Sequence, residues 1–346
     1  MRFRASLLWP VVVAGGLFFG WACAMRGPDS RTLTLGAYSA PREAFREIHE
    51  DFKRYWLEKT GERIEIRESY LGSGAQSRAV VDGFPADVVA LSLEPDVERI
   101  VKAGLIRHPW REAPHGGMVT RSVVAFAVRD GNPKGIRDWA DLARSDVELL
   151  TPNPRTSGGA MWNILAAYGA AQRGRVVGYA GGPEGGKEFL AALLRRVIAM
   201  DKGARESILT FEKGLGDVAL SYENEIKVGS EHSLSYPYQL VMPSSSILIE
   251  NPVALVDANV EKHGNRKLAE AYLNYLFSPA AQRVFAKWSF RPVNEEVWRE
   301  QAKNFSDPAD LFSIAEFGGW AKAVPEFFGK EGLFAQLSEQ KGRGAK

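Results

Sequence analysis

Short apolar segments alternate with longer amphipathic ones along most of the chain. Residues 32–37, 64–69 and 86–93 are short runs rich in apolar or alternating side chains, which is typical of strands. Between them, residues 42–59 and 75–81 carry apolar side chains at helical spacing. Strands that alternate with helices build parallel sheets through crossover connections, so this pattern predicts an α/β fold.

The alternation resumes after a loop-rich stretch at residues 113–117. The pattern predicts further strands at residues 123–128, 147–150 and 217–221 and further helices at residues 160–171, 187–196, 266–277 and 279–288. Residues 238–257 then form one long extended run, which is long enough to cross between two lobes. Two crossing strands would act as a hinge.

The length of 346 residues suits two lobes, each with its own core. We expect residues 31–117 and 249–346 to form the first lobe and residues 118–248 to form the second. The first predicted helix should contribute to a core and not to a ligand cage. Its apolar side chains at helical spacing are Phe45, Ile48, Phe52, Tyr55 and Trp56.

The first 24 residues are predicted to be a signal peptide. Arg2 and Arg4 form a basic start, and residues 7–22 form an apolar stretch that is short for a membrane span. Ala22-Cys23-Ala24 offers a cleavage site, whereas Cys23 could instead be lipidated; we favour cleavage and keep lipidation and an uncleaved anchor as alternatives. Either form of export would place the protein in the periplasm.

Charge and cysteine content exclude several classes of protein. The formal net charge is +2, and cleavage after Ala24 would leave 42 basic and 42 acidic residues. A neutral exported chain is not suited to binding nucleic acid. Cleavage would also remove the only cysteine, which excludes disulfides, a thiol nucleophile and a cysteine metal site.

Candidate chemistry lies where predicted strands give way to predicted helices. Ser157, Gly158 and Gly159 stand at one such junction, and Ser73 lies between two glycines at another, upstream. A helix start leaves its first N–H groups unpaired and carries the positive end of the helix dipole, so a small anion can bind there. Two such starts in different halves of the chain suggest a clamp on one ligand, although each alone could be an ordinary helix cap.

A third helix start follows Gly203 and Ala204, whose N–H groups could also contribute to the clamp. Arg205 beside them could instead hold a carboxylate of the fold. The loop at residues 178–186 is rich in glycine, but its proline and glutamate disrupt the spacing of a phosphate-binding loop, so we interpret it as a surface loop.

The sequence offers little for catalysis or for a cofactor. Its five histidines have no metal-ligand spacing, and no serine stands in the context of a hydrolase nucleophile. Glu223 and Glu225 could act as an acid–base pair, but they fit better as the first turn of a helix that follows a strand. We therefore expect no catalysis, no metal and no cofactor.

A series of short segments carries a resemblance to a known family. In chain order these segments are Gly72-Ser73-Gly74, Ala86-Asp87-Val88-Val89, Gly131-Asn132-Pro133-Lys134, Thr151-Pro152-Asn153-Pro154, Ser157-Gly158-Gly159-Ala160, Gly203-Ala204-Arg205, Gly216-Asp217-Val218, Glu223-Asn224-Glu225, Pro243-Ser244 and Phe317-Gly318-Gly319-Trp320-Ala321-Lys322-Ala323. From about Thr32 to Gln336 the chain resembles the periplasmic sulfate-binding proteins of ABC transporters, a family that includes thiosulfate-binding relatives.

The resemblance implies a two-lobed periplasmic-binding-protein fold of type II, with a ligand in the cleft between the lobes and a two-strand hinge. In that family a dehydrated sulfate is held by neutral donors. Carried over by motif, these donors are the hydroxyls of Ser73 and Ser157 and the N–H groups of Gly158, Gly159 and Ala204.

Two positions depart from the family pattern. Tyr222 stands where well-known members have a tryptophan whose indole N–H reaches the anion; a phenol hydroxyl also donates, but along a different axis, and it can accept as well. Ser39 stands where the first loop of the family commonly has aspartate. We expect Tyr222 to donate to the ligand, and Ser39 is a weaker candidate for the same role.

The sequence therefore predicts a monomeric binding protein that captures sulfate and delivers it to the membrane permease of an ABC importer. Hydrogen phosphate carries a proton that needs an acceptor, so a site made of donors disfavours it by about 1–3 kcal/mol. Thiosulfate, molybdate and tungstate remain open as ligands. Two other roles also remain open: an enzyme acting on a sulfate or phosphate ester with Glu223 and Asp217, and signalling through a membrane receptor.

Overall fold

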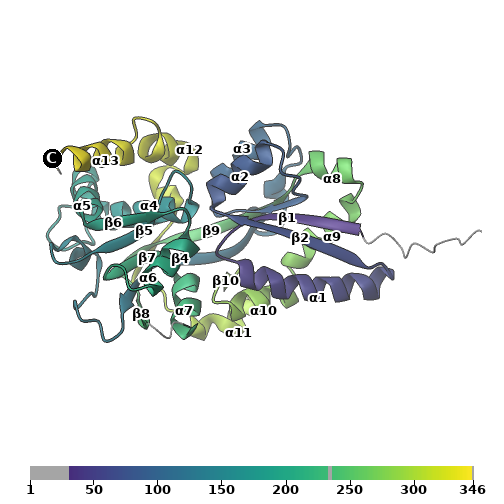
Figure 1. Ribbon diagram of the computed structural model, residues 1–346, viewed down its shortest axis with the longest axis horizontal. Helices are drawn as coiled ribbons and strands as arrows, with labels where there is room; N and C mark the ends of the chain where they lie inside the picture. Colours follow the sequence, from purple (N-terminus) through teal and green to yellow (C-terminus); the bar gives the residue numbers. More distant parts are fainter. Residues whose placement is uncertain (1–30, 233–235, 345–346) are drawn as a thin grey trace, which may run out of the picture.

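The chain folds into two α/β lobes that lie side by side along the longest axis of the molecule (Figure 1). The computed structural model describes residues 31–232 and 236–344. The predicted signal peptide at residues 1–24, including Cys23, lies outside the described residues. Strands run through both lobes as one continuous sheet in the order β2-β1-β3-β9-β4-β7-β5-β6.

The first lobe is built around three parallel strands. These are β1 (Arg31–Tyr38), β2 (Ile64–Leu71) and β3 (Val88–Ala90), with β1 in the centre. The helices of this lobe are α1 (Arg42–Thr60), α2 (Ser73–Val81), α3 (Glu94–Lys102), α8 (Asp257–His263), α9 (Arg266–Leu276) and α10 (Pro279–Lys287). The predicted aromatic face of α1 is buried, except that Tyr55 is partly exposed, so those side chains do form core.

The second lobe repeats the arrangement. Its strands are β5 (Leu149–Pro152), β6 (Val197–Asp201), β7 (Val218–Tyr222) and β8 (Tyr238–Val241), and its helices are α4 (Gly158–Gln172), α5 (Pro183–Arg196), α6 (Ala204–Glu212) and α7 (Glu223–His232). The predicted surface loop at residues 178–186 is too long. Pro183 begins α5, because its fixed φ and missing N–H suit the first turn of a helix.

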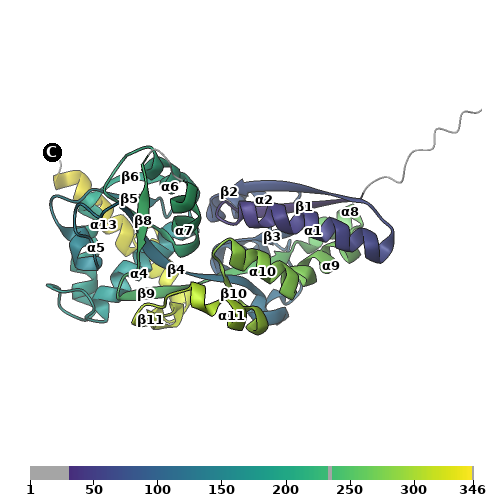
Figure 2. The ribbon, with the colours of Figure 1, turned by 90° about the horizontal axis from the view of Figure 1, so that it is seen from below.

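Two long antiparallel strands cross between the lobes. β4 (Met118–Arg129) and β9 (Ser245–Leu255) pair with each other near the middle of the molecule (Figures 1 and 2). β9 continues into the first lobe beside β3, and β4 continues into the second lobe beside β7. The predicted extended run at residues 238–257 is interrupted at residues 242–244, so that its first part, β8, pairs separately with β4.

The carboxyl-terminal segment packs on the second lobe. After α11 (Glu295–Gln301) the chain crosses back, and β11 (Asp310–Phe312) pairs with β9. Helices α12 (Trp320–Ala323) and α13 (Leu333–Gly344) then lie beside α4 and α5 (Figure 1). The structure thus differs from the predicted first lobe, residues 249–346, from about residue 310 onward.

Contacts with α4 explain this placement. Phe312 and Phe327 are buried in the same core as Trp162 of α4. Gly169 of α4 makes room for Phe312 and Phe317, because a Cβ atom there would lie 2.5 Å from Cζ of Phe312 and 3.0 Å from Cζ of Phe317. A sequence pattern shows that a terminal helix has an apolar face but not which core that face covers.

We expect Phe327→Ala to lower the free energy of unfolding by about 3–5 kcal/mol, because it would leave a cavity in this core. The neighbouring Phe328 is only partly buried, and Phe328→Ala is the matched control with a smaller loss. Urea unfolding of both variants measures the difference. Equal losses would show that the carboxyl-terminal segment does not share the core of the second lobe.

Candidate functional site

A small cavity of about 10 Å³ lies at the boundary between the lobes. It is lined by Tyr38, Ser39, Gly72, Ser73, Ser92, Ser157, Gly158, Gly159, Ala204 and Tyr222. All seven residues predicted to bind the ligand are among them. Tyr38, Gly72 and Ser92 were not predicted. Gly72 nevertheless lies within a segment that carries the resemblance. Ser92 follows the end of a strand, β3, as several of the predicted residues do.

The position of the cavity follows from the topology. The lining residues lie at the carboxyl ends of β1, β2, β3, β5, β6 and β7 or in the loops and helix starts that follow them. Ligands of open α/β sheets bind beyond the carboxyl ends of the strands, because the loops to the next helices gather there. Here two such edges face each other across the boundary between the lobes.

Three helices begin at this cavity. α2 begins at Ser73, α4 at Gly158 and α6 at Ala204, and none of these starts has a hydrogen bond from a capping side chain. Apart from the N–H of Ala75 in α2, which donates to the carbonyl of Thr156, their first N–H groups and their dipoles therefore remain available to a ligand. Since α2 belongs to the first lobe and α4 and α6 to the second, a bound anion would be held from both sides.

The serine hydroxyls of the cavity differ in their hydrogen bonds. Ser73 donates through Oγ to Oδ2 of Asp96 at 2.6 Å and accepts the N–H of Ser92 at 2.9 Å. Ser39 and Ser157 are each 3% exposed, and no described residue pairs with their hydroxyls. Ser39 and Ser157 thus have hydroxyl protons free for a ligand, whereas the proton of Ser73 would first have to turn away from Asp96.

Tyr222 also differs from a simple donor. Its Oη lies 2.6 Å from Oγ of Ser92, and its side chain is 2% exposed. Burial raises the pKa of the Tyr222 phenol, so this hydroxyl keeps its proton at any physiological pH.

The lobes are in contact across the cavity, so the structure shows a closed form. Ala75 of α2 donates its N–H to the carbonyl of Thr156 at 3.4 Å. Glycines permit this approach: a Cβ atom on Gly72 would lie 2.6 Å from O of Thr156, and one on Gly158 would lie 2.5 Å from Oγ of Ser92. Larger side chains at these two positions would hold the lobes apart.

Charged side chains surround the cavity without lining it. Arg205 bridges the lobes by pairing with Glu43 of α1 at 2.6 Å and with Glu225 of α7 at 3.2 Å. Glu223 pairs with Arg291 and Lys227, each at 2.8 Å. Both acidic residues of the candidate acid–base pair are therefore engaged in ion pairs at the start of α7, which is the structural role that the sequence favoured.

Within residues 31–232 and 236–344, no group of three or more histidine, cysteine, aspartate or glutamate side chains could hold a metal ion. Over the same residues, no helix combines the length and the apolar character needed to cross a membrane.

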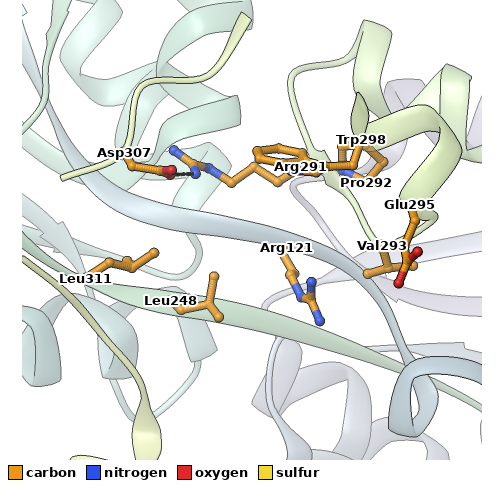
Figure 3. A pocket seen from close by; sticks show the side chains of 9 residues that line it. All are labelled: Arg121, Leu248, Arg291, Pro292, Val293, Glu295, Trp298, Asp307 and Leu311. Carbon is orange, nitrogen blue, oxygen red and sulfur yellow. Dashed lines mark hydrogen bonds and ion pairs between the residues drawn. The ribbon is translucent and has the colours of Figure 1, made fainter. Parts of the chain in front are cut away.

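A larger hollow of about 290 Å³ lies beside the crossing strands (Figure 3). Arg121 and Leu248 on these strands and Trp298 on α11 are among the residues that line it. Arg291 belongs to this hollow too, but its guanidinium is already bonded to Glu223, Asp307 and the carbonyl of Ser306. Helix α11 begins at this hollow, but Glu295 and Glu296 in its first turn would repel an anion, so the smaller cavity is the better site for one.

Two lobes that close on a small polar cavity define a binding protein for a small solute. The chain belongs to the family of bacterial extracellular solute-binding proteins, which matches residues 33–291. The fold predicted from the sequence, a two-lobed type II binding protein, is confirmed by the relatives described next.

Similar proteins place the chain more finely within this family. It is 43% identical to a sulfate-binding protein of Synechococcus elongatus over 89% of this chain and 86% of the relative. It is 37% identical to a thiosulfate-binding protein of Escherichia coli over 88% of this chain and 90% of the relative. The solved structure of the sulfate-binding protein SubI from Mycobacterium tuberculosis superposes with a TM-score of 0.76 and 37% identity, covering 86% of this chain and 99% of SubI.

The site also predicts a dependence of stability on pH. Burial raises the pKa of Glu225 from its ordinary value of 4.5 to about 7, although Arg205 acts in the opposite direction. The folded state then binds more protons than the unfolded state between these two values, so the contribution of Glu225 to stability falls as pH rises from about 4.5 to 7. Glu43, Glu206 and Glu212 act in the same direction as burial.

We expect the parent protein to lose stability relative to Glu225→Gln as the pH rises from 5 to 8. Urea unfolding at several pH values measures this difference, and Glu300→Gln on the exposed face of α11 is the control. A constant difference between parent and Glu225→Gln would show that Glu225 is ionised throughout this range.

Proposed function

We propose that this chain binds sulfate in the cavity between its lobes and delivers it to the membrane permease of an ABC importer. One observation carries the proposal: three helix starts from both lobes meet at a cavity that contains no charged side chain. Such a site can hold a small anion by oriented dipoles alone. The sulfate-binding relatives, up to 43% identical, support sulfate as this anion.

The donors we propose are the N–H groups of Gly158, Gly159 and Ala204 and the hydroxyls of Ser157, Ser39 and Tyr222, together with that of Ser73 once its proton turns away from Asp96. Closure would replace the water around the anion with these fixed donors. A cleft lined only by neutral groups leaves no charged side chain without a partner when it is empty and open. The ligand can therefore leave without separating an ion pair.

Sulfate should be preferred over hydrogen phosphate. Of the hydroxyls in the cavity, those of Ser39 and Ser157 are free to donate, and the helix starts offer only N–H groups. The N–H groups cannot accept the proton of hydrogen phosphate, so a hydroxyl would have to accept it and give up its own donation to the anion, which costs about 1–3 kcal/mol. Thiosulfate is the main alternative because a thiosulfate-binding relative is 37% identical, and molybdate and tungstate are further candidates.

Transport accounts better for this site than catalysis does. The relatives described above are named as binding proteins, and the acidic residues of the rival enzyme hypothesis are occupied: Glu223 is ion-paired, and Asp217 accepts the N–H of Glu148 at 2.9 Å. We propose a periplasmic location for a monomer exported by the signal peptide. Association with permease components, and not with a signalling receptor, would distinguish transport from sensing.

Calorimetric titration of the extensively dialysed protein with sulfate, thiosulfate, phosphate, molybdate and tungstate tests the ligand. We expect one-to-one binding of sulfate and binding of phosphate that is about 5- to 150-fold weaker. Ser157→Ala should weaken sulfate binding about tenfold or more, since it removes a hydrogen bond to a charged ligand. Turnover of a sulfate or phosphate ester by the purified protein would contradict the proposal.

Gly158→Ala tests whether the closed form is the binding form. Its methyl group would lie 2.5 Å from Oγ of Ser92 in the closed lobes but would meet no such contact once the lobes separate. We expect a 10- to 100-fold loss of sulfate affinity with little change in unfolding. Gly181→Ala is the control, because the nearest atom to its Cβ would be 3.6 Å away. Parent-like affinity of Gly158→Ala would refute the assigned pocket.

A further inference from the structure

Ser92 and Tyr222 form a hydrogen bond that joins the two lobes. Ser92 follows β3 in the first lobe, and Tyr222 ends β7 in the second. The two hydroxyl oxygens are 2.6 Å apart, and the side chains are 0% and 2% exposed. Since the residues belong to different lobes, this bond exists only while the lobes are closed.

We propose that Ser92 is a positioning residue for the anion: it pairs with Tyr222 on closure and directs the one remaining hydroxyl proton of the pair to the ligand. This inference rests on the proposed function, because it assumes that an anion occupies the cavity. It assigns a role to a residue that the sequence pattern did not reveal.

The backbone of Ser92 is held from three directions. Its N–H donates to Oγ of Ser73, and its carbonyl accepts from Nε1 of Trp162 at 3.1 Å and from Nδ2 of Asn251 at 3.2 Å. Trp162 belongs to the second lobe and Asn251 to a crossing strand. These bonds fix the place of the Ser92 hydroxyl in the closed form and leave it free to rotate about one bond.

The pair lies directly beside the helix start that offers N–H groups to the anion. A Cβ atom on Gly158 would lie 2.5 Å from Oγ of Ser92, and one on Gly159 would lie 2.9 Å from Cε2 of Tyr222. The two hydroxyls carry two protons, and the bond between them uses one. The other proton has no partner among the described residues, so it can be donated to an anion at the N–H groups of α4.

The orientation of neighbouring hydrogen bonds favours this arrangement. Ser73 donates a hydrogen bond through its hydroxyl to Asp96, which is also paired with Arg99 at 2.7 Å. The Ser73 oxygen is therefore an acceptor for the N–H of Ser92 and does not compete for the Ser92 hydroxyl. A hydroxyl pair replaces the single fixed N–H that an indole would supply at position 222.

A double-mutant cycle on sulfate binding tests the pair. Ser92→Ala and Tyr222→Phe should each weaken binding about fivefold, and the double variant should lose about the same and not about 25-fold, because either change breaks the one hydrogen bond that fixes the direction of the remaining proton. Tyr222→Phe keeps the buried ring, so it provides a variant whose fold is not at risk. Ser338→Ala, which removes a hydroxyl on α13 far from the cavity, is the control.

Stopped-flow kinetics supply a readout that a purely structural role would not change. Loss of a bond made only after closure should raise the sulfate dissociation rate about fivefold and leave the association rate unchanged. Additive losses in the cycle, or parent-like dissociation of Ser92→Ala, would overturn the role of Ser92 while leaving the proposed function intact. If the parent protein binds none of the five oxyanions, the proposed function fails, and the role of Ser92 fails with it.

Discussion

The convergence of three uncapped helix starts on one cavity is the constraint on which the rest of the structure depends. Each start must bring backbone N–H groups to the cavity. The lobes must therefore approach closely at Gly72 and Gly158, where even a Cβ atom would clash with the other lobe. The strands before these helices must end at the same place, which requires parallel sheets whose carboxyl edges face each other. The two-lobed fold is thus the scaffold that brings dipoles from both sides to one point.

Charged side chains lie outside this point and in pairs. Arg291, on the two-residue strand β10 (Arg291–Pro292), bonds to the fully buried Glu223 at the start of α7. Arg291 lies beside the crossing strands (Figure 3), so its pair with Glu223 joins elements of the two lobes. A buried ion pair is costly to break. Arg291 and Glu223 therefore stay paired with each other, and neither charged side chain turns into the cavity. Arg205, which pairs with carboxylates from both lobes, has the same effect on the other side.

Local patterns predicted most of the fold because each predicted strand and helix depends on residues close in sequence. The helix from 42 to 59 and the strand from 217 to 221 lie within about one residue of α1 and β7. The packing of residues 310–337 was not predictable in this way. Their apolar faces fit Gly169 and Trp162, which are more than 140 positions away, and nothing in the local sequence specifies that contact.

The same distinction applies to the site. Ser157, Gly158 and Gly159 could be predicted because a strand, a hydroxyl, two glycines and a helix follow one another in the sequence. Ser92 is preceded by a strand too, but leucine lies on either side of it, and its neighbours show no anion motif. Its importance arises from Tyr222, 130 residues away in the chain and 2.6 Å away in the closed protein. A residue that acts only through closure has no local pattern, and so the folded structure is needed to find it.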